Sequence, residues 1–444
     1  MHRSTAAVIL LTSLAWLGGV PAASALEVTG QVLDEQGRPI EGADVDLILE
    51  PSAFEAARVS LVGGLGGDVV DAAATTGDGW FTLTAPSAGF YRVRVDVDGY
   101  APVANPLHPL IEARTLHPLR LRPAAPLRLT LVGKDGAPLE GGWVRMNWCR
   151  YSPGPWDGGA IIRRGWRPAW RTAVSGPGGL AQLPVVAGET VSIEAGHGDL
   201  TLLRTVRGAG APVRLVLRAL AERTVRIVDA DGRPASVLVD VTGEPPAYTD
   251  ADGVVSLHAH LDGGQELELV TPGGLRHRTP WRGEAEIRLP AVEPLRGRVV
   301  DAGDGAALAD AFLWRSGETP RWTVSRRGGV FEWSAFAGAD PNLGLRAAAY
   351  GYRETPVHGL EETALTPVRM IRGRVLDGNG APIGGVEVHV DAENIGRTSS
   401  RSPSTVSGPD GRFRYSAANV TQTYSLRAHL PSRPPAVALA APGV

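Results

Sequence analysis

The residues best suited to bind a ligand are tryptophans and arginines that gather between Trp143 and Arg171. Five of the chain's 11 tryptophans lie in this stretch, together with six arginines and a single acid, Asp157. Indole rings can stack on the faces of sugars, and guanidinium groups pair with carboxylates or sulfates. We therefore expect a loop that binds a polysaccharide or a cell-surface protein. The candidate ligand-binding residues are Trp156, Arg163, Arg164, Trp166, Arg167 and Trp170.

The tryptophans also have a purely structural interpretation. Trp143 and Trp148 can be core residues of a strand, and for Trp143 we expect this. The tryptophans further along the segment can cover a long insertion against its own domain. Trp314, Trp322 and Trp333 stand at strand spacing, which favours a place in a core or on a sheet surface.

Two pairs of aspartates resemble the start of a calcium loop, namely Asp229 with Asp231 and Asp250 with Asp252. Alternate aspartates can direct oxygens at one ion, but neither pair is followed by the distal glutamate that such a loop uses. Aspartates that cap tight turns are the favoured interpretation.

Neither a metal site nor a catalytic site is expected elsewhere. His258 and His260 share one face of an expected strand, and the apolar Val255 and Leu257 on the other face make the histidine face the solvent face. No third metal ligand is evident. The chain contains no zinc-protease, serine-hydrolase or phosphate-loop motif. We therefore expect no cofactor and no enzymatic activity.

The N-terminus predicts export. A basic start precedes an apolar stretch from Ala6 to Val20, and small residues end at Ala25, as in a signal peptide cleaved after that residue. No later stretch approaches the roughly 20 apolar residues of a membrane span. The net charge of -3 indicates neither nucleic acid nor an anionic membrane as a partner, and the single Cys149 excludes an internal disulfide. We expect a secreted, periplasmic or cell-surface protein.

An internal repeat organises the mature chain. The segment from Gly30 to Ile40 returns almost unchanged from Gly373 to Ile383, and three weaker copies lie between them. A repeat at domain-sized spacing indicates a string of similar modules in an extended array. The expected divisions are a signal peptide at 1–25 and modules at 26–122, 123–221, 222–292, 293–369 and 370–444. The second module carries the insertion rich in tryptophan and arginine.

Within each copy the apolar residues alternate with polar ones. The stretches from Tyr91 to Val97 and from Val386 to Val390 are examples, so each predicts a strand with one face in a core. Glycine-containing turns such as Gly77-Asp78-Gly79 separate the strands. These features predict an all-β chain of about five small β-sandwich modules.

The order of these signals resembles the carboxypeptidase regulatory-like domain. The matching parts are the turn from Asp34 to Ile40, the Gly77-Asp78-Gly79 turn followed by Phe81, and Asp98-Gly99-Tyr100 at the end of an alternating strand. The match is good in the first and last copies, fair in the fourth and degenerate in the second and third. The resemblance implies a seven-stranded, transthyretin-like (Ig-like) β-sandwich and a non-catalytic accessory module of exported bacterial proteins.

We therefore expect a non-enzymatic exported array that acts as a spacer and binding scaffold, with carbohydrate binding through the second module. Two alternatives stay open: a protein-adhesion array, and the accessory N-terminal region of a larger hydrolase or outer-membrane receptor. The last copy bears on this choice, because after Tyr424 to Ala428 it offers only Ala436 to Leu439 as a further strand. Either the sandwich of this copy has fewer strands than the others, or the sequence is a fragment of a longer protein.

Overall fold

The structure is a computed structural model that describes residues 25–444 apart from 53, 56–66, 102, 150–171, 187–189, 199, 208–211, 220, 242–246, 260–264, 316–320, 339–343, 359–360, 393–403, 418–423, 430–435 and 441–444. Five pairs of sheets follow one another along the chain, which confirms the predicted all-β array of sandwich modules. We call the sheet that holds the start of each repeat the first sheet, and its partner the second sheet. The exact ends of the modules stay a prediction.

Module 1 packs a first sheet in the order β4-β1-β7, with β8 also paired to β1, against a second sheet in the order β3-β2-β5-β6. Its core includes Val32, Leu47, Tyr91 and Leu121, which are all fully buried. The strands are β1 (Leu26–Leu33), β2 (Asp44–Leu49), β3 (Val69–Ala74), β4 (Trp80–Ala85), β5 (Gly89–Asp96), β6 (Val103–Leu110), β7 (Arg114–Thr115) and β8 (Leu119–Arg120).

Module 2 has a first sheet in the order β12-β9-β15 and a second sheet in the order β11-β10-β13-β14-β16. Leu129, Val144, Ile193 and Leu215 meet between the sheets. The elements are β9 (Ala124–Val132), β10 (Trp143–Cys149), β11 (Thr172–Val174), the 3-10 helix η1 (Pro177–Gly179), β12 (Leu180–Val186), β13 (Thr190–His197), β14 (Leu200–Arg207), β15 (Val213–Val216) and β16 (Arg218–Ala219).

Module 3 pairs a first sheet in the order β20-β17-β23 with a second sheet in the order β19-β18-β21-β22. Ile227, Val239 and Leu267 are core residues, and Phe336 of module 4 joins the same cluster. The strands are β17 (Ala221–Val228), β18 (Leu238–Val241), β19 (Ala247–Tyr248), β20 (Val254–Ala259), β21 (Gln265–Val270), β22 (Arg276–Trp281) and β23 (Glu286–Arg288).

Module 4 repeats the arrangement, with a first sheet in the order β27-β24-β30 and a second sheet in the order β26-β25-β28-β29. Val299, Leu313, Phe331 and Trp333 fill its core. The strands are β24 (Val292–Asp301), β25 (Phe312–Arg315), β26 (Trp322–Val324), β27 (Val330–Phe336), β28 (Leu345–Ala348), β29 (Thr355–Pro356) and β30 (Glu362–Leu365).

Module 5 has a first sheet of β31-β34 and a second sheet in the order β33-β32-β35-β36. Its described core is smaller, with Ile371, Val388, Val390 and Leu426 buried. The strands are β31 (Arg369–Arg374), β32 (Glu387–Ala392), β33 (Ser404–Val406), β34 (Arg412–Ala417), β35 (Tyr424–His429) and β36 (Ala436–Ala440).

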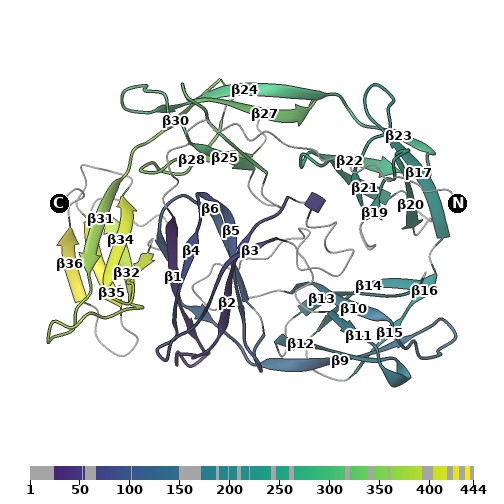
Figure 1. The fold of residues 1–444 in the computed structure, drawn as a ribbon, viewed down its shortest axis with the longest axis horizontal. Coiled ribbons are helices and arrows are strands. Elements are labelled where there is room, and N and C mark those ends of the chain that lie inside the picture. Colours follow the sequence, from purple (N-terminus) through teal and green to yellow (C-terminus); the bar gives the residue numbers. More distant parts are fainter. Residues whose placement is uncertain are drawn as a thin grey trace, which may run out of the picture.

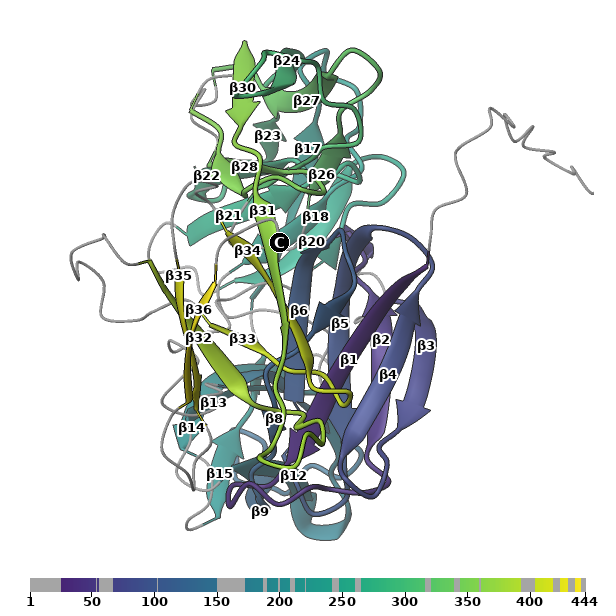
Figure 2. The same cartoon turned by 90° about the vertical axis from the view of Figure 1, so that its left-hand side faces the viewer.

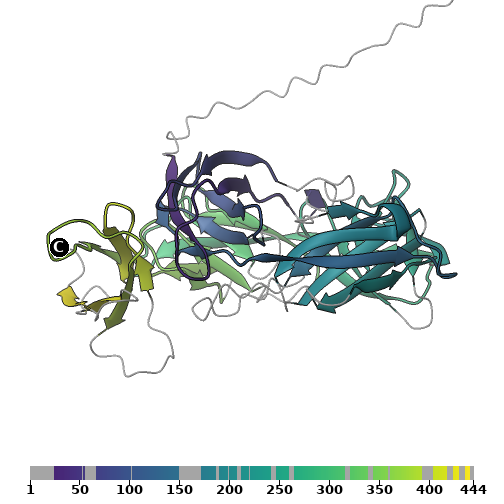
Figure 3. The ribbon, with the colours of Figure 1, turned by 90° about the horizontal axis from the view of Figure 1, so that it is seen from below.

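Modules 1 to 4 lie around a closed circuit, and module 5 stands outside it at one end of the molecule (Figures 1 and 3). Figure 2 shows module 5, in yellow and light green, next to the purple module 1. Buried clusters join modules that are distant in the sequence, such as Phe90 with Trp314 and Phe54 with Leu238. The expectation of an extended array is therefore wrong for modules 1 to 4, because the chain folds back and module 4 packs on module 1.

Candidate functional site

The predicted ligand-binding loop of module 2 extends from two described strands. Residues Trp156, Arg163, Arg164, Trp166, Arg167 and Trp170 lie outside the described residues. The segment that holds them, 150–171, connects β10 to β11, which pair antiparallel from Trp143 opposite Val174 to Arg145 opposite Thr172. The loop thus leaves from and returns to one hairpin of the second sheet.

Trp143 is not a core residue, contrary to the sequence expectation. Val144 is fully buried among the core residues of module 2, so its neighbour Trp143 points to the other face of the sheet. A Cβ atom at Gly196, directly opposite on β13, would overlap the Trp143 ring. The half-buried indole therefore lies flat on the glycine, on the outer face of the second sheet.

The aspartates of module 3 cap turns, as the sequence predicts. The carboxylate of Asp229 accepts hydrogen bonds from the backbone N–H groups of Asp231 and Arg233, both at 2.9 Å. Asp231 forms an ion pair with Arg233 at 3.3 Å. Asp250 likewise accepts from the N–H groups of Asp252 and Val254. These oxygens are thereby committed to the turns.

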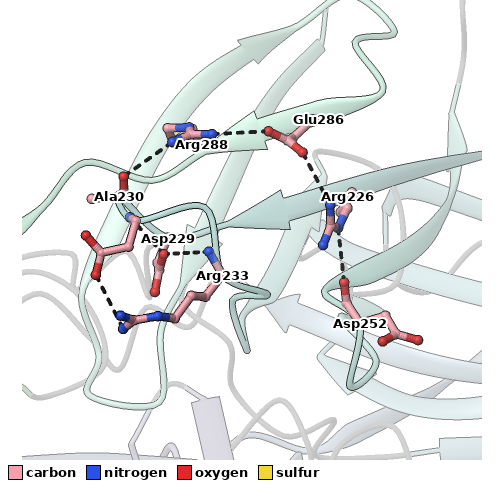
Figure 4. Close-up of polar contacts among 8 residues, drawn as sticks. Arg226, Asp229, Ala230, Arg233, Asp252, Glu286 and Arg288 are labelled. Carbon is pink, nitrogen blue, oxygen red and sulfur yellow. Dashed lines mark hydrogen bonds and ion pairs between the residues drawn. The ribbon is translucent and has the colours of Figure 1, made fainter.

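An arginine links two edges of the same first sheet. Arg226 on β17 lies 3.7 Å from the carboxylate of Glu286 on β23, and its Nε donates to the Asp252 carbonyl at 3.4 Å (Figure 4). Arg288 faces Glu286 from the same strand, at 3.6 Å.

Within the described ranges, no group of three or more His, Cys, Asp and Glu side chains is placed to hold a metal ion. His260 lies outside those ranges, and His258 is opposite Glu222 in the sheet.

An aromatic cluster joins module 1 to module 4. Phe90 follows the alternation of β5 onto the outer face of its sheet, since its neighbour Tyr91 is in the core. Phe90 is nevertheless 0% exposed, because Phe312 and Trp314 of β25 cover it. The ring centroids of Phe90 and Trp322 are 5.6 Å apart with the planes inclined by 23°. We call Phe90, Phe312, Trp314 and Trp322 the aromatic contact.

A buried ion pair lies next to the aromatic contact. Arg92 stands two residues after Phe90 on the same outer face of β5 and is almost fully buried. Its Nε is 3.8 Å from a carboxylate oxygen of Glu50, which is also largely buried. A buried arginine is costly unless an opposite charge accompanies it. On the outer face of module 1, Phe90 and Arg92 are therefore buried by other parts of the protein and do not face solvent.

A second contact joins module 1 to module 3. The Tyr248 hydroxyl donates a 2.6 Å hydrogen bond to the Phe54 carbonyl, and the two rings meet edge to face with centroids 5.0 Å apart. Leu238 and Val270, on the outer face of the second sheet of module 3, are fully buried in the same cluster. Module 1 thus touches module 3 as well as module 4.

Modules 3 and 4 also share side chains at their junction. His277 packs edge to face on Phe336, and burial lowers the pKa of the histidine. Within module 4, Arg321 lies over the Trp333 ring, 4.3 Å from its centroid. Burial, with a smaller effect of the nearby Arg315, lowers the pKa of Arg321 to about 10. The arginine remains charged at neutral pH.

Sequence reasoning missed the aromatic contact. Alternation correctly placed Tyr91 in the core. For Trp322 and Trp333 the spacing left a core or a sheet surface open, and the structure has Trp333 in the core of module 4 and Trp322 on a sheet surface. Alternation within one strand could not show that the second sheets of modules 1 and 4 face one another. The available signal was the pair Phe90-Tyr91, in which two successive aromatic residues indicate a strand covered on both faces.

Comparisons with known proteins agree with the fold. The model of the carboxypeptidase regulatory-like domain matches residues 27–115. Solved structures that resemble the chain include a streptococcal ancillary pilin (14% identity, TM-score 0.20, 44% of this chain and 62% of the pilin covered). A second is the minor pilin GBS52 of Streptococcus agalactiae, with 13% identity, a TM-score of 0.20, and 44% of this chain and 97% of the pilin covered. A third is the shaft pilin SpaA of Lactobacillus rhamnosus GG, with 12% identity, a TM-score of 0.18, and 44% of this chain and 98% of the pilin covered.

Because these TM-scores are 0.20 or lower, the similarity to pilins says nothing about how the modules of this chain are arranged or what the chain does. The aligned region spans less than two thirds of the streptococcal ancillary pilin. No curated protein matches the chain. In the part of the chain that the structure describes, no helix is long and apolar enough to cross a membrane. Residues 27–115 thus match the carboxypeptidase regulatory-like domain, a non-catalytic type of domain, and the two-sheet topology of module 1 agrees with that match.

Proposed function

We propose that the chain is an exported, non-catalytic scaffold in which modules 1 to 4 close into a frame that presents binding loops. The observation that carries this proposal is the complete burial of Phe90, an outer-face residue of module 1, by module 4. A string of spacers needs no such contact between its first and fourth units. Export is supported by the signal-peptide pattern that ends at Ala25.

The aromatic contact is strong enough to hold such a frame closed. Burying a phenylalanine side chain contributes about 1.5–3 kcal/mol. Each favourable ring pair adds about 0.5–1.5 kcal/mol. Modules 1 and 4 belong to one chain, so they meet at an effective concentration in the millimolar range rather than by free diffusion. A modest interface therefore suffices to keep them together.

Calorimetry tests the frame. In the mature chain, modules 1 to 4 should unfold in one main transition because each supports the next. The Phe90→Asp variant places a charge in the aromatic contact, and it should split this transition into several. Tyr350→Asp is the matched control, since Tyr350 belongs to module 4 and is 70% exposed. Separate transitions in the wild-type chain would count against the frame.

We propose in addition that the 150–171 loop binds a glycan through Trp156, Trp166 and Trp170, with Arg163, Arg164 and Arg167 pairing with acidic groups on it. The support is the clustering of tryptophan and arginine, which is uncommon on inert surfaces. The loop leaves from one hairpin, between β10 and β11, and a rigid base of this kind reduces the entropy lost on binding.

A titration tests the loop. Tryptophan fluorescence of the mature chain would be followed against a panel of bacterial and plant polysaccharides, neutral and acidic. The triple alanine variant at positions 156, 166 and 170 should abolish a saturable change, whereas Tyr350→Ala, at an exposed aromatic residue of module 4, should leave it intact. If the panel gives no change, or if the triple variant binds as the wild type does, the glycan proposal fails. A folded protein partner would then be sought.

A further inference from the structure

Four arginines gather on one face of module 5, where β31 and β34 lie side by side (Figure 2). Each strand of this pair turns alternate side chains inward, including Ile371, which is buried in the core. The residues between them share the outer face of the first sheet. This face carries Arg372, Arg374, Arg412 and Arg414, which are all exposed. We call these four side chains the arginine face.

The arginines of the two strands stand directly opposite one another. β31 and β34 pair antiparallel, with Arg372 opposite Arg414 and Arg374 opposite Arg412. Residues directly opposite have Cβ atoms about 5 Å apart, and residues two apart on one strand are about 7 Å apart. The four Cβ atoms thus form a rectangle of about 5 by 7 Å. Like charges placed opposite each other destabilise a sheet.

Acidic side chains offset only part of this charge. Arg412 lies 3.4 Å from the Asp410 carboxylate, and Arg374 donates from Nε to the Asp410 carbonyl at 2.9 Å. Arg372 and Arg414 form no ion pair with any residue that the structure describes. Over residues 369–444 the sequence has nine arginines and five acids, so module 5 as a whole is basic.

The first sheets of modules 1 to 4 do not place two arginines at these positions. The pairs equivalent to Arg372 with Arg414 are Thr29 with Thr82, Arg128 with Gln182, Thr224 with Ser256, and Arg296 with Glu332. The pairs equivalent to Arg374 with Arg412 are Gln31 with Trp80, Thr130 with Leu180, Arg226 with Val254, and Arg298 with Val330.

Module 4 shows the arrangement that a stable sheet favours. Its Arg296 faces Glu332, and the two side chains form an ion pair at 3.3 Å. Module 5 has Arg414 where module 4 has this glutamate, so an attraction is replaced by a repulsion. Proteins break local rules of this kind at functional sites, where a ligand supplies what the fold lacks.

We propose that the arginine face binds a linear acidic polysaccharide. A guanidinium group presents a planar fork of donors that pairs with carboxylates and sulfates. Four such groups in one rectangle match a ligand with several negative charges better than one small anion. The negative groups of the ligand also remove the repulsion between Arg372 and Arg414. This site is separate from the 150–171 loop and does not depend on the function proposed for that loop.

The composition of the face favours a polysaccharide over a protein or a membrane. A protein interface has an apolar centre, and an amphipathic helix that binds a membrane surface places apolar side chains beside its basic ones. No apolar side chain stands between the four arginines, because Arg372 and Arg374 are successive outward residues of β31, as Arg412 and Arg414 are of β34. The contact is therefore electrostatic, and added salt should weaken it.

Dextran sulfate is the probe, and dextran is the control with the same backbone and no charge. Binding would be followed by calorimetric titration in the mature chain and in a second chain, in which the six candidate residues of the 150–171 loop are alanine. The second chain separates the arginine face from the loop. We expect it to bind dextran sulfate saturably, with an affinity that falls as salt is added, and not to bind dextran.

Arg414→Glu in the second chain is the decisive variant. It restores the arrangement of Arg296 and Glu332 in module 4, so the fold should be kept and the midpoint of urea unfolding should not fall. The affinity for dextran sulfate should nevertheless fall by at least about tenfold. Arg327→Glu makes the same change of charge at an exposed residue of a module 4 turn, and it should leave the affinity unchanged.

Hydrogen exchange places the ligand on the sheet. Amides of 371–374 and 412–416 should exchange more slowly with dextran sulfate and at the same rate with dextran. The proposal is overturned if the second chain does not bind dextran sulfate, if Arg414→Glu binds it as tightly as Arg327→Glu does, or if exchange at these amides does not change. It is also overturned if phosphatidylglycerol vesicles bind through Arg414 and dextran sulfate does not, since the partner is then a membrane.

Discussion

The ring of Phe90 in module 1 stacks on the indole of Trp322 in module 4, with their centroids 5.6 Å apart. Removing either ring should cost stability, and removing both should cost less than the sum. We expect a coupling of about 0.5–1.5 kcal/mol in a double-mutant cycle of Phe90→Ala and Trp322→Ala, measured by urea unfolding. Additive effects would mean that the two rings do not meet in solution.

The hydrogen bond from Tyr248 to Phe54 should stabilise the contact between modules 1 and 3. Tyr248→Phe keeps the edge-to-face ring packing but removes the donor to the Phe54 carbonyl. The expected loss is about 1 kcal/mol, seen as a lower thermal midpoint. Tyr350→Phe removes a hydroxyl from an exposed side chain and should leave the midpoint unchanged.

Gly253 illustrates why glycine stands at the second turn of the repeat. Its φ is +75°, and a Cβ atom there would lie 2.5 Å from the Ile227 carbonyl oxygen. A residue with a Cβ atom at a positive φ loses about 1–2 kcal/mol of stability from the backbone conformation alone. Gly253→Ala should lower the free energy of unfolding by clearly more than this, because of the added overlap. Gly305→Ala, at a φ of +72° with open space around it, should show only that smaller cost in the same denaturant assay. Equal losses would exclude the steric explanation.

Asp34 should make module 1 sensitive to acid. Burial opposes ionisation of this carboxyl, but the backbone N–H and guanidinium of Arg38, with the N–H of Gln36, hold its pKa below the ordinary value. A lowered folded-state pKa gives stability that is present above the unfolded-state pKa of about 3.9 and is lost as the pH falls through the folded-state pKa.

The comparison for this prediction is Asp34→Asn, followed by unfolding at a series of pH values. The wild-type chain should exceed the variant in stability near neutral pH, and the difference should shrink as the pH falls below about 4. A difference that is independent of pH would show that the carboxylate charge contributes nothing at this turn.

The parts of the fold predicted from the sequence are those set by local pattern. Alternation placed Tyr91 and Val388 in cores, and the repeated glycine turns marked the breaks between strands, because period two and positive φ are properties of a few adjacent residues. The turn at Gly79 is not a hairpin, since it joins β3 of the second sheet to β4 of the first sheet. Asp229 and Asp250 were recognised as turn caps for the same reason.

The contacts between modules were not predictable in this way. Phe90 and Trp322 each stand on a sheet face that alternation assigns to solvent, and no local pattern tells which distant face will cover them. Trp143 was misplaced by its size, since a large aromatic residue suggests a core, while the smaller Val144 occupies that position. The ligand-binding role of Trp156, Trp166 and Trp170 stays a prediction.

Small-angle X-ray scattering of the mature wild-type chain tests the central claim most directly. A closed frame of modules 1 to 4 with module 5 at one end predicts a maximum dimension far shorter than five modules in line, and a Phe90→Asp chain that is clearly longer than the wild type. A wild-type curve that fits five modules end to end, unchanged by Phe90→Asp, would contradict the account.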